Sequence, residues 1–168
     1  IQNHIPSLDN SLRKQQYLDG ISHTLSLLPQ KIQPIIVENN GYRETYLDHF
    51  QHYNKKVPVL YTNNNNYQFK NKGVNEILDI KEVIKQYNIN DDDMIIKLTG
   101  RYKVTSSLFF EKIIQSQHSI DASIKFFGSC SLKYEMYDCI LGMYALRCLY
   151  FKLLDHNWIN LHLSPEIA

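Results

Sequence analysis

The chain has 168 residues, of which 43% are hydrophobic and 21% are charged. This length suits one domain, and the apolar content is sufficient for a packed core, which excludes a chain that is disordered throughout. Eighteen basic and seventeen acidic side chains leave a net charge of +1, so the composition does not point to nucleic acid as a partner.

The sequence shows no recognisable targeting signal, and its cysteine usage is typical of a reducing compartment, so we expect a cytoplasmic protein. No apolar run approaches the roughly 20 residues that span a bilayer, and residues 1–10 lack the pattern of a signal peptide. Cys130, Cys139 and Cys148 form no close pair, which argues against a disulfide framework and a zinc site. The chain starts at Ile1 without a Met, so we expect a fragment of a longer chain that lacks its first strand.

Apolar periodicity predicts helices and strands in alternation. Apolar residues at spacings of three and four predict amphipathic helices, and short β-branched runs bounded by polar turns predict strands. In chain order, the predicted elements are a helix over 7–28, a strand over 35–37, a helix over 42–53, a strand over 57–61, a helix over 74–87, a strand over 94–98, a helix over 106–116, strands over 124–127 and 140–146, and a helix over 148–156.

Strands that alternate with helices imply right-handed βαβ units. We therefore predict a single α/β domain over residues 1–168, with a mainly parallel sheet and flanking helices. In such sheets the carboxyl ends of the strands gather at one edge, where ligands bind. Residues 38–41, 62–66 and 99–102 would lie together at that edge.

Two pairs of residues are candidates for binding a nucleotide at this edge. Glu38 could accept hydrogen bonds from ribose hydroxyls, and the amide of Asn39 could pair with a base edge, although an Asn-Asn-Gly turn would explain the same residues. Asn71 and Lys72 precede a predicted helix, and the amino end of a helix attracts anions.

The segment after the third strand carries the remaining candidates. Thr99 and Gly100 allow a ligand to approach the backbone closely. Arg101 offers a planar fork that suits phosphate oxygens, and Tyr102 offers an apolar ring with a hydroxyl group. The alternative for Arg101 is a structural ion pair with a buried acid. Lys97 lies within the strand, where burial is costly unless the lysine reaches an acid.

The other titratable residues give weaker indications of a catalytic or metal-binding role. Glu135 and Asp138 lie near a late strand, and either could act as a general base, although a lone acid in a loop is more often simply solvated. The triplet Asp91–Asp93 precedes a strand and therefore lies at the opposite edge, where a solvated turn is a better explanation than a metal site. His49 and His52 have no obvious partners for a metal site. The chain has no dinucleotide, P-loop or hydrolase motif.

Four stretches stand in an order found in a known family: IIVENNG (35–41), VPVLYTNNNNYQFKNKGVNEILDI (57–80), MIIKLTGRY (94–102) and CILGMYALRCLYFKLL (139–154). Together they resemble a nucleotide-sugar glycosyltransferase of the GT-A fold, and in particular small viral and bacterial glycosyltransferase-like proteins with a Lys-any-Thr-Gly-Arg-Tyr segment. The resemblance implies a Rossmann-like sheet that is truncated at its first strand.

The resemblance also implies roles for individual residues. Glu38 and Asn39 would touch the nucleoside. Asn71, Lys72 and Asn75 would lie near the diphosphate or the nucleoside.

Residues 99–102 depart from the family pattern. They contain no carboxylate, whereas the family has a metal-binding Asp-any-Asp motif there. Either Arg101 and a lysine neutralise the leaving diphosphate without a metal, or the domain has lost its activity. A Mn²⁺ or Mg²⁺ cofactor stays open, and no metal ligand is assigned.

The resulting hypothesis is a glycosyltransferase with a nucleotide-sugar donor and a hydroxyl acceptor on a glycan or a protein. The resemblance makes Asp138 the base that deprotonates the acceptor in an inverting transfer. One alternative is an inactive GT-A-like domain that binds glycans or proteins. Another is a different nucleotide-binding α/β enzyme, such as a methyltransferase with Glu38 on a ribose.

Overall fold

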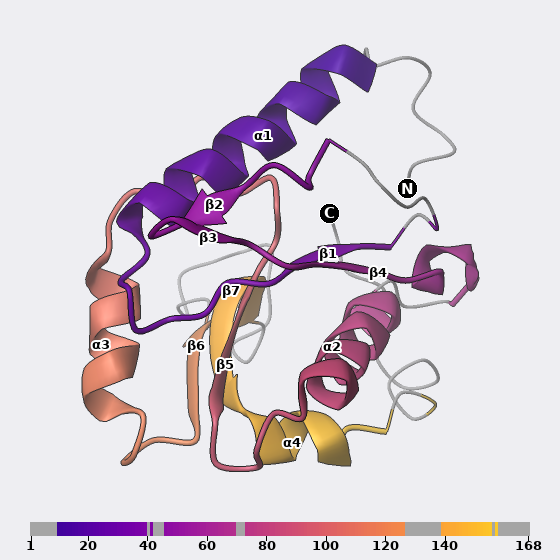
Figure 1. Ribbon diagram of the computed structural model, residues 1–168. Helices are drawn as coiled ribbons and strands as arrows, with labels where there is room; N and C mark the ends of the chain where they lie inside the picture. The colour runs from indigo at the N-terminus through magenta and orange to yellow at the C-terminus, as the bar shows by residue number, and fades with distance from the viewer. Residues whose placement is uncertain are drawn as a thin grey trace, which may run out of the picture.

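Helices and strands alternate along the part of the chain that the computed structural model describes, which is residues 10–39, 41, 46–69, 73–126, 139–155 and 157 (Figure 1). The helices are α1 (Asn10–Leu27), the 3₁₀ helix η1 (Asn64–Asn66), α2 (Gly73–Tyr87), α3 (Leu108–Ser116) and α4 (Cys148–Leu153). The strands are β1 (Ile36–Glu38), β2 (Gln51–His52), β3 (Lys55–Lys56), β4 (Val59–Tyr61), β5 (Met94–Leu98), β6 (Ala122–Phe126) and β7 (Cys139–Arg147). The fold is therefore mixed α/β, as predicted.

Strands β1 and β4 form a parallel pair. Ile36 lies opposite Val59, and Glu38 lies opposite Tyr61. Because the two strands run in the same direction, the segments that follow Glu38 and Tyr61 start side by side. In Figure 1, α1 lies on one side of this pair and α2 on the other. This part of the predicted parallel arrangement is confirmed.

Strands β5, β7 and β6 form a second sheet in that order, with β7 antiparallel to both neighbours. Strands β5 and β6 run in the same direction and are connected through α3, as in a βαβ unit, but β7 is inserted between them. The prediction of a mainly parallel sheet is therefore wrong for these strands. Hydrophobic periodicity identifies a strand without identifying its neighbours, so it did not reveal the insertion.

The predicted helix over 42–53 is also wrong for its described part. Residues 46–49 form a turn, and β2 pairs antiparallel with β3. Tyr53 and Asn54 connect these strands with φ angles of 45° and 60°, the left-handed conformation that tight hairpin turns require. The aromatic residues of this segment have the spacing of an amphipathic helix, although the described part is not helical. The other predicted helices and strands are found in the described part of the chain, with boundaries that differ by a few residues.

Two groups of buried side chains form the core. One group joins α2, β7 and α4, and the other joins the end of α1 to α3. Phe151 in the first group is 0% exposed, and burial of a side chain of this size contributes about 2 kcal/mol. The buried members are Ile84, Tyr144, Cys148 and Phe151 in the first group and Leu28, Val104 and Phe110 in the second.

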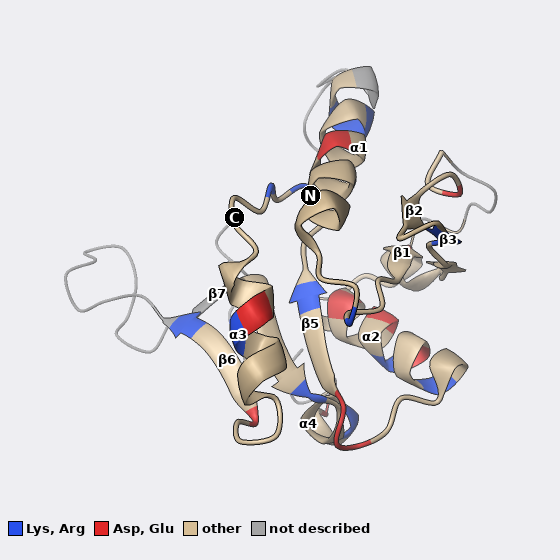
Figure 2. Cartoon of the chain, turned by 60° about the vertical axis from the view of Figure 1, so that its left-hand side comes forward, with Lys and Arg blue, Asp and Glu red and all other residues tan. Residues whose placement is uncertain are grey.

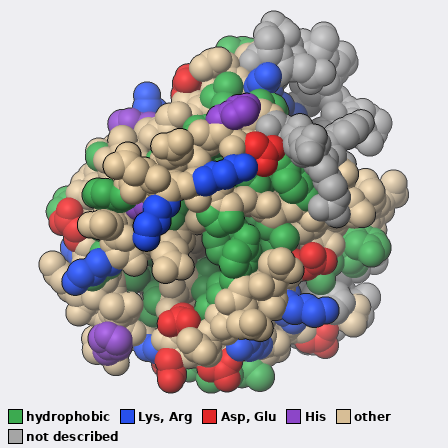
Figure 3. Space-filling model, in the orientation of Figure 1, with side chains coloured by type: hydrophobic (Ala, Val, Ile, Leu, Met, Phe, Trp, Pro, Cys, Tyr) green, Lys and Arg blue, Asp and Glu red, His purple; other side chains and the backbone are tan. Residues whose placement is uncertain are grey.

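Acidic and basic residues are spread over the described elements. Figure 2 shows segments of both signs on α1, α2 and α3. Figure 3 shows apolar side chains in the middle of one face, with acidic and basic side chains around them. The charge on this face is therefore mixed. None of the helices in the described part of the chain is long and apolar enough to cross a bilayer.

Candidate functional site

A buried carboxylate joins the carboxyl ends of β1 and β4 to α2. Asp79 on α2 is 7% exposed. Its Oδ2 accepts a hydrogen bond from Asn39 Nδ2 at 2.8 Å, and its Oδ1 accepts from Thr62 Oγ1 at 2.7 Å and from Asn64 Nδ2 at 2.8 Å. We call these four residues the Asp79 cluster. Because each carboxylate oxygen has a donor, the cluster holds the segments after both strands in one arrangement.

The backbone continues this connection beyond the strands. The Thr62 amide donates to the Glu38 carbonyl at 2.9 Å, and the Gly41 amide donates to the Thr62 carbonyl at 3.0 Å. Gly41 has a φ of +82°, a conformation that suits glycine. Glu38 and Asn39 therefore lie at the shared edge, as predicted.

Tyr46 lies close to Glu38 and to residues of α1. Burial raises the pKa of the Tyr46 hydroxyl above its ordinary value, and the nearby Glu38 and Tyr17 raise it further, whereas Arg13 acts in the opposite direction. Lys14 places its Nζ 4.7 Å from the centroid of the Tyr46 ring, within the range of a cation–π contact. Helix α1 thus brings two cations to the carboxyl end of β1.

The amino end of α2 connects this edge to β5. Asn75 in the first turn of α2 donates from Nδ2 to the Asn64 carbonyl at 2.8 Å. Glu76, its neighbour, forms an ion pair with Lys97 of β5. Lys97 also donates to Thr99 Oγ1 at 2.9 Å. The prediction that Lys97 reaches an acid is confirmed, and the pair fixes the start of α2 beside the end of β5.

Residues 99–102, which we call the β5 turn, are packed between α1 and β7. The Thr99 amide donates to the Gly142 carbonyl of β7 at 2.9 Å. A Cβ atom on Gly100 would lie 3.1 Å from the Tyr17 ring, and one on Gly20 would lie 2.8 Å from the Gly100 carbonyl oxygen. The absence of a side chain at Gly100 thus makes room for α1, and the approach of a ligand to this backbone stays a prediction.

The last two residues of the β5 turn reach the surface. Tyr102 is 51% exposed, and its ring lies against Gly142, where a Cβ atom would meet it at 1.7 Å. Arg101 is exposed. A structural ion pair with a buried acid was the alternative for Arg101, and its exposure leaves the guanidinium accessible to a ligand instead.

The structure thus joins several predicted residues through hydrogen bonds and packing. Glu38, Asn39 and Asn75 are connected through the Asp79 cluster, and the Glu76–Lys97 ion pair links α2 to the β5 turn with Thr99, Gly100, Arg101 and Tyr102. The predicted residues Asn71, Lys72 and Asp138 lie outside the described residues.

Sequence reasoning missed two contributors to this edge. The first is Asp79, which lies four residues before the buried Val83 on the same face of α2; an acid on a buried helical face signals a polar cluster. The second is the face of α1 with Tyr17 and Gly20. A glycine inside a helix signals close packing of another backbone, but the partner could not be inferred.

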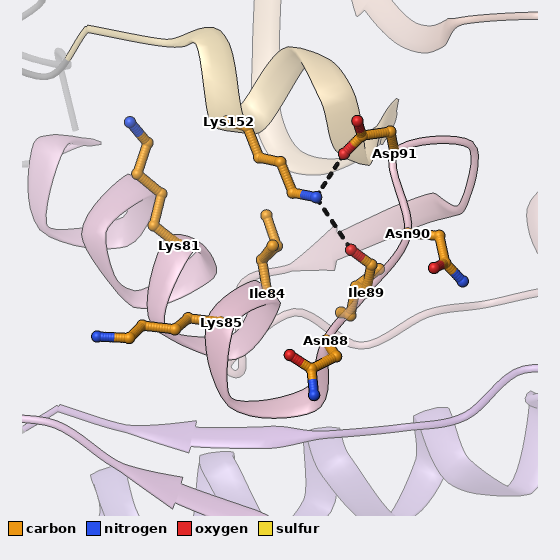
Figure 4. A pocket seen from close by; sticks show the side chains of 8 residues that line it. All are labelled: Lys81, Ile84, Lys85, Asn88, Ile89, Asn90, Asp91 and Lys152. Atoms are coloured by element: carbon orange, nitrogen blue, oxygen red, sulfur yellow. Dashed lines mark hydrogen bonds and ion pairs between the residues drawn. The ribbon is translucent and has the colours of Figure 1, made fainter.

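A pocket of about 690 Å³ lies elsewhere, at the amino end of β5 (Figure 4). Two of its three lysines are engaged within the protein. Lys152 binds the Asp91 carboxylate and donates to the Ile89 carbonyl at 3.1 Å, and Lys81 donates to the Leu154 carbonyl at 2.5 Å. None of the predicted site residues lines this pocket. Its full lining is Lys81, Ile84, Lys85, Asn88, Ile89, Asn90, Asp91 and Lys152.

Within the described ranges, no three His, Cys, Asp or Glu side chains are grouped so that they could hold a metal ion. A scan against protein-family models and searches of curated proteins and solved structures found no match to the chain. What the protein binds is therefore inferred from the side chains at the edge formed by β1, β4 and the β5 turn.

Proposed function

We propose that the protein is a glycosyltransferase of the GT-A type, which moves a sugar from a nucleotide-sugar donor to a hydroxyl group of a glycan or protein. One observation carries the proposal. The carboxyl ends of β1 and β4, the amino end of α2 and the β5 turn are joined through Asp79 and the Glu76–Lys97 ion pair. Strand ends of this kind are where α/β proteins bind nucleotides, and the resemblance of residues 94–102 supplies the reaction class.

In the proposed reaction, Glu38 and Asn39 contact the nucleoside, and Arg101 and Lys72 contact the diphosphate. The carboxylate of Asp138 takes the proton of the acceptor hydroxyl, whose oxygen attacks the anomeric carbon. The bond from that carbon to the diphosphate oxygen breaks, and the diphosphate leaves with the electron pair. Cationic groups can stabilise this leaving group in place of a metal ion.

Lys97 is unsuited to that role. Its ammonium group already pairs with Glu76 and donates to Thr99, and its side chain is 10% exposed. Arg101 is an exposed cation in the β5 turn, and its fork suits phosphate oxygens. Among the described residues, Arg101 is therefore the one that we expect to stabilise the leaving diphosphate.

A binding domain without transferase activity is the second candidate. The β5 turn contains no carboxylate, so it lacks the metal-binding pair on which the resembling enzymes depend. Such a domain would keep the fold and bind a sugar or a protein without breaking a glycosidic bond.

The first test measures the release of nucleoside diphosphate from a panel of nucleotide sugars. We expect turnover by the wild type and a loss of about 100- to 1,000-fold in Arg101→Ala, because the leaving group loses a cationic partner. Lys112→Ala removes the same charge from an exposed position on α3 and should keep wild-type turnover.

Three results would contradict parts of this proposal. Equal turnover in wild type and Arg101→Ala removes the arginine from the mechanism. Donor binding in calorimetry without release of nucleoside diphosphate, with any acceptor in the panel, favours the binding domain. No binding of any donor contradicts nucleotide-sugar recognition altogether.

A further inference from the structure

One face of helix α1 covers the β5 turn. Arg13, Tyr17, Gly20 and Thr24 follow one another at spacings of four, three and four residues, so they lie on the same side of the helix. Gly20 and Tyr17 pack against Gly100. Since this face is held against the turn at Tyr17 and Gly20, Arg13 lies one helical turn further along the same surface.

The amino-terminal part of this face is positively charged. Arg13 is close enough to Tyr46 to oppose the rise in the pKa of its hydroxyl, and Glu38 is close enough to add to that rise. Lys14 lies over the Tyr46 ring. Arg13 and Glu38 therefore both lie near Tyr46, so the positively charged part of this face lies near the carboxyl end of β1.

A donor atom of Arg13 lacks a hydrogen bond. Its Nε is buried and has no acceptor among the described residues. Buried N–H groups normally have partners, because leaving one unsatisfied costs about 1–3 kcal/mol. An anion that supplied an oxygen to this group would remove that cost. Arginine also suits phosphate because its donors form a planar fork.

We propose that Arg13 is a phosphate-binding residue, which holds the diphosphate of the donor from α1 while Arg101 holds it from the β5 turn. The identity of the donor rests on the proposed function, whereas the anion site itself does not. A leaving diphosphate carries more than one negative charge, so a further cation beside Arg101 and Lys72 would stabilise it more fully. Arg13 supplies this cation without a metal ion.

The test uses inorganic pyrophosphate as the probe, titrated into the protein in a calorimeter at low ionic strength. We expect the wild type to bind it and Arg13→Gln to bind it at least tenfold more weakly. Lys112→Gln makes the same charge change on an exposed part of α3 and should leave the affinity unchanged. Equal affinity in the wild type and Arg13→Gln, or no binding by the wild type, overturns the proposal.

A second measurement does not depend on the folding of a variant. The Nε–H signal of Arg13 in the wild-type protein, assigned from its loss in Arg13→Lys, is followed by NMR during the same titration. We expect this signal to move along the same saturation curve as the calorimetric binding. A signal that stays in place while pyrophosphate binds would locate the anion elsewhere and overturn the role of Arg13.

The test of the anion site can fail or succeed independently of the test of glycosyl transfer. Pyrophosphate binding that depends on Arg13, in a protein that turns over no nucleotide sugar, supports the anion site and contradicts glycosyl transfer. Turnover of a nucleotide sugar together with unchanged pyrophosphate affinity in Arg13→Gln supports glycosyl transfer and contradicts the role of Arg13.

Discussion

Asp79 holds a charge in a buried position, and three neutral groups donate to it. Asn39 reaches it from the end of β1, and Thr62 and Asn64 reach it from the end of β4. A buried carboxylate is tolerated when its oxygens are fully hydrogen-bonded. The geometry of the edge therefore depends on one side chain of α2 that itself has little exposure to a ligand.

Replacement of Asp79 should show how much these bonds matter. Asp79→Ala leaves three donors unsatisfied, so we expect the free energy of unfolding to fall by about 3 kcal/mol. Asp79→Asn keeps one acceptor oxygen, and the amide of Asn39 can turn its own oxygen towards the new NH₂ group, so we expect a loss of about 1 kcal/mol. Urea denaturation measures both values.

Glu82→Ala provides the matched control, because it removes an exposed acid from the same helix. Its effect should be within about 0.5 kcal/mol of zero. A loss in Asp79→Ala no larger than that in Glu82→Ala would show that the hydrogen bonds of the cluster contribute little.

At the scale of elements, α1 and the β5 turn approach each other through two glycines. A Cβ atom on Gly20 would lie 2.8 Å from the Gly100 carbonyl oxygen. A backbone oxygen cannot move aside as a flexible side chain can, so the position of α1 depends on the absence of a side chain at residue 20.

Gly20→Ala should therefore act against the usual trend. An alanine in place of a helical glycine normally stabilises a helix by about 1 kcal/mol. Here we expect the free energy of unfolding to fall by about 1–3 kcal/mol, because the new methyl group forces α1 away from the turn. Ser22→Ala, at an exposed position on the same helix, is the control for helix propensity. Stabilisation by Gly20→Ala in urea denaturation would contradict the close contact.

The elements themselves were largely predictable, whereas their pairing was not. The stripe over 74–87 and the apolar run over 94–98 reflect burial along a short segment, so the sequence predicts α2 and β5 directly. The insertion of β7 between β5 and β6 depends on contacts between distant segments. The failure at 42–53 has a local cause, since a hairpin turn with left-handed residues overrode the aromatic spacing.

The residues of the candidate site also divide into those that the sequence could place and those that it could not. Glu38, Asn39 and Thr99 could be placed at an edge because each follows a strand. Asp79 and Arg13 could not, because each lies on a helix whose neighbours are set by tertiary packing. The hydrogen-bonded cluster and the cationic face of α1 therefore became visible only in three dimensions.

At the scale of the whole molecule, Arg147 binds two segments that are distant from it in sequence. At the end of β7 it donates to the Asp121 carboxylate at 2.8 Å, and to the backbone carbonyls of Asp92, Gln117 and Ile120. These bonds join the start of β5 to the connection between α3 and β6. A planar fork can serve several carbonyls at once, which a lysine cannot do.

The hydrogen bond between Arg147 and the Asp121 carboxylate should make the stability of the protein depend on pH. The hydrogen bond from Arg147, followed by the one from Tyr150, holds the pKa of the Asp121 carboxyl below its ordinary value of 3.8. Because the folded state lowers this pKa, the contribution of Asp121 is present above pH 3.8 and is lost as the pH falls through the folded-state pKa. We therefore expect Asp121→Asn to be less stable than the wild type near pH 6 and to match it at strongly acidic pH.

Thermal denaturation across this pH range measures the difference. Asp92→Asn is the control, because Arg147 binds the backbone carbonyl of Asp92 and not its carboxylate. A difference between Asp121→Asn and the wild type that persists unchanged in strong acid would show that the ionised carboxylate is not the stabilising group.

The meeting of Gly20 with Gly100 also has a consequence for biosynthesis. The two residues are separated by 80 positions, and contacts across such separations are made late, after local structure has formed. On the ribosome, α1 emerges before the segment that receives it and cannot dock on that segment until it has been synthesised. Helix α1 therefore stays undocked until the β5 turn has been synthesised, and the contact between α1 and this turn forms only after that.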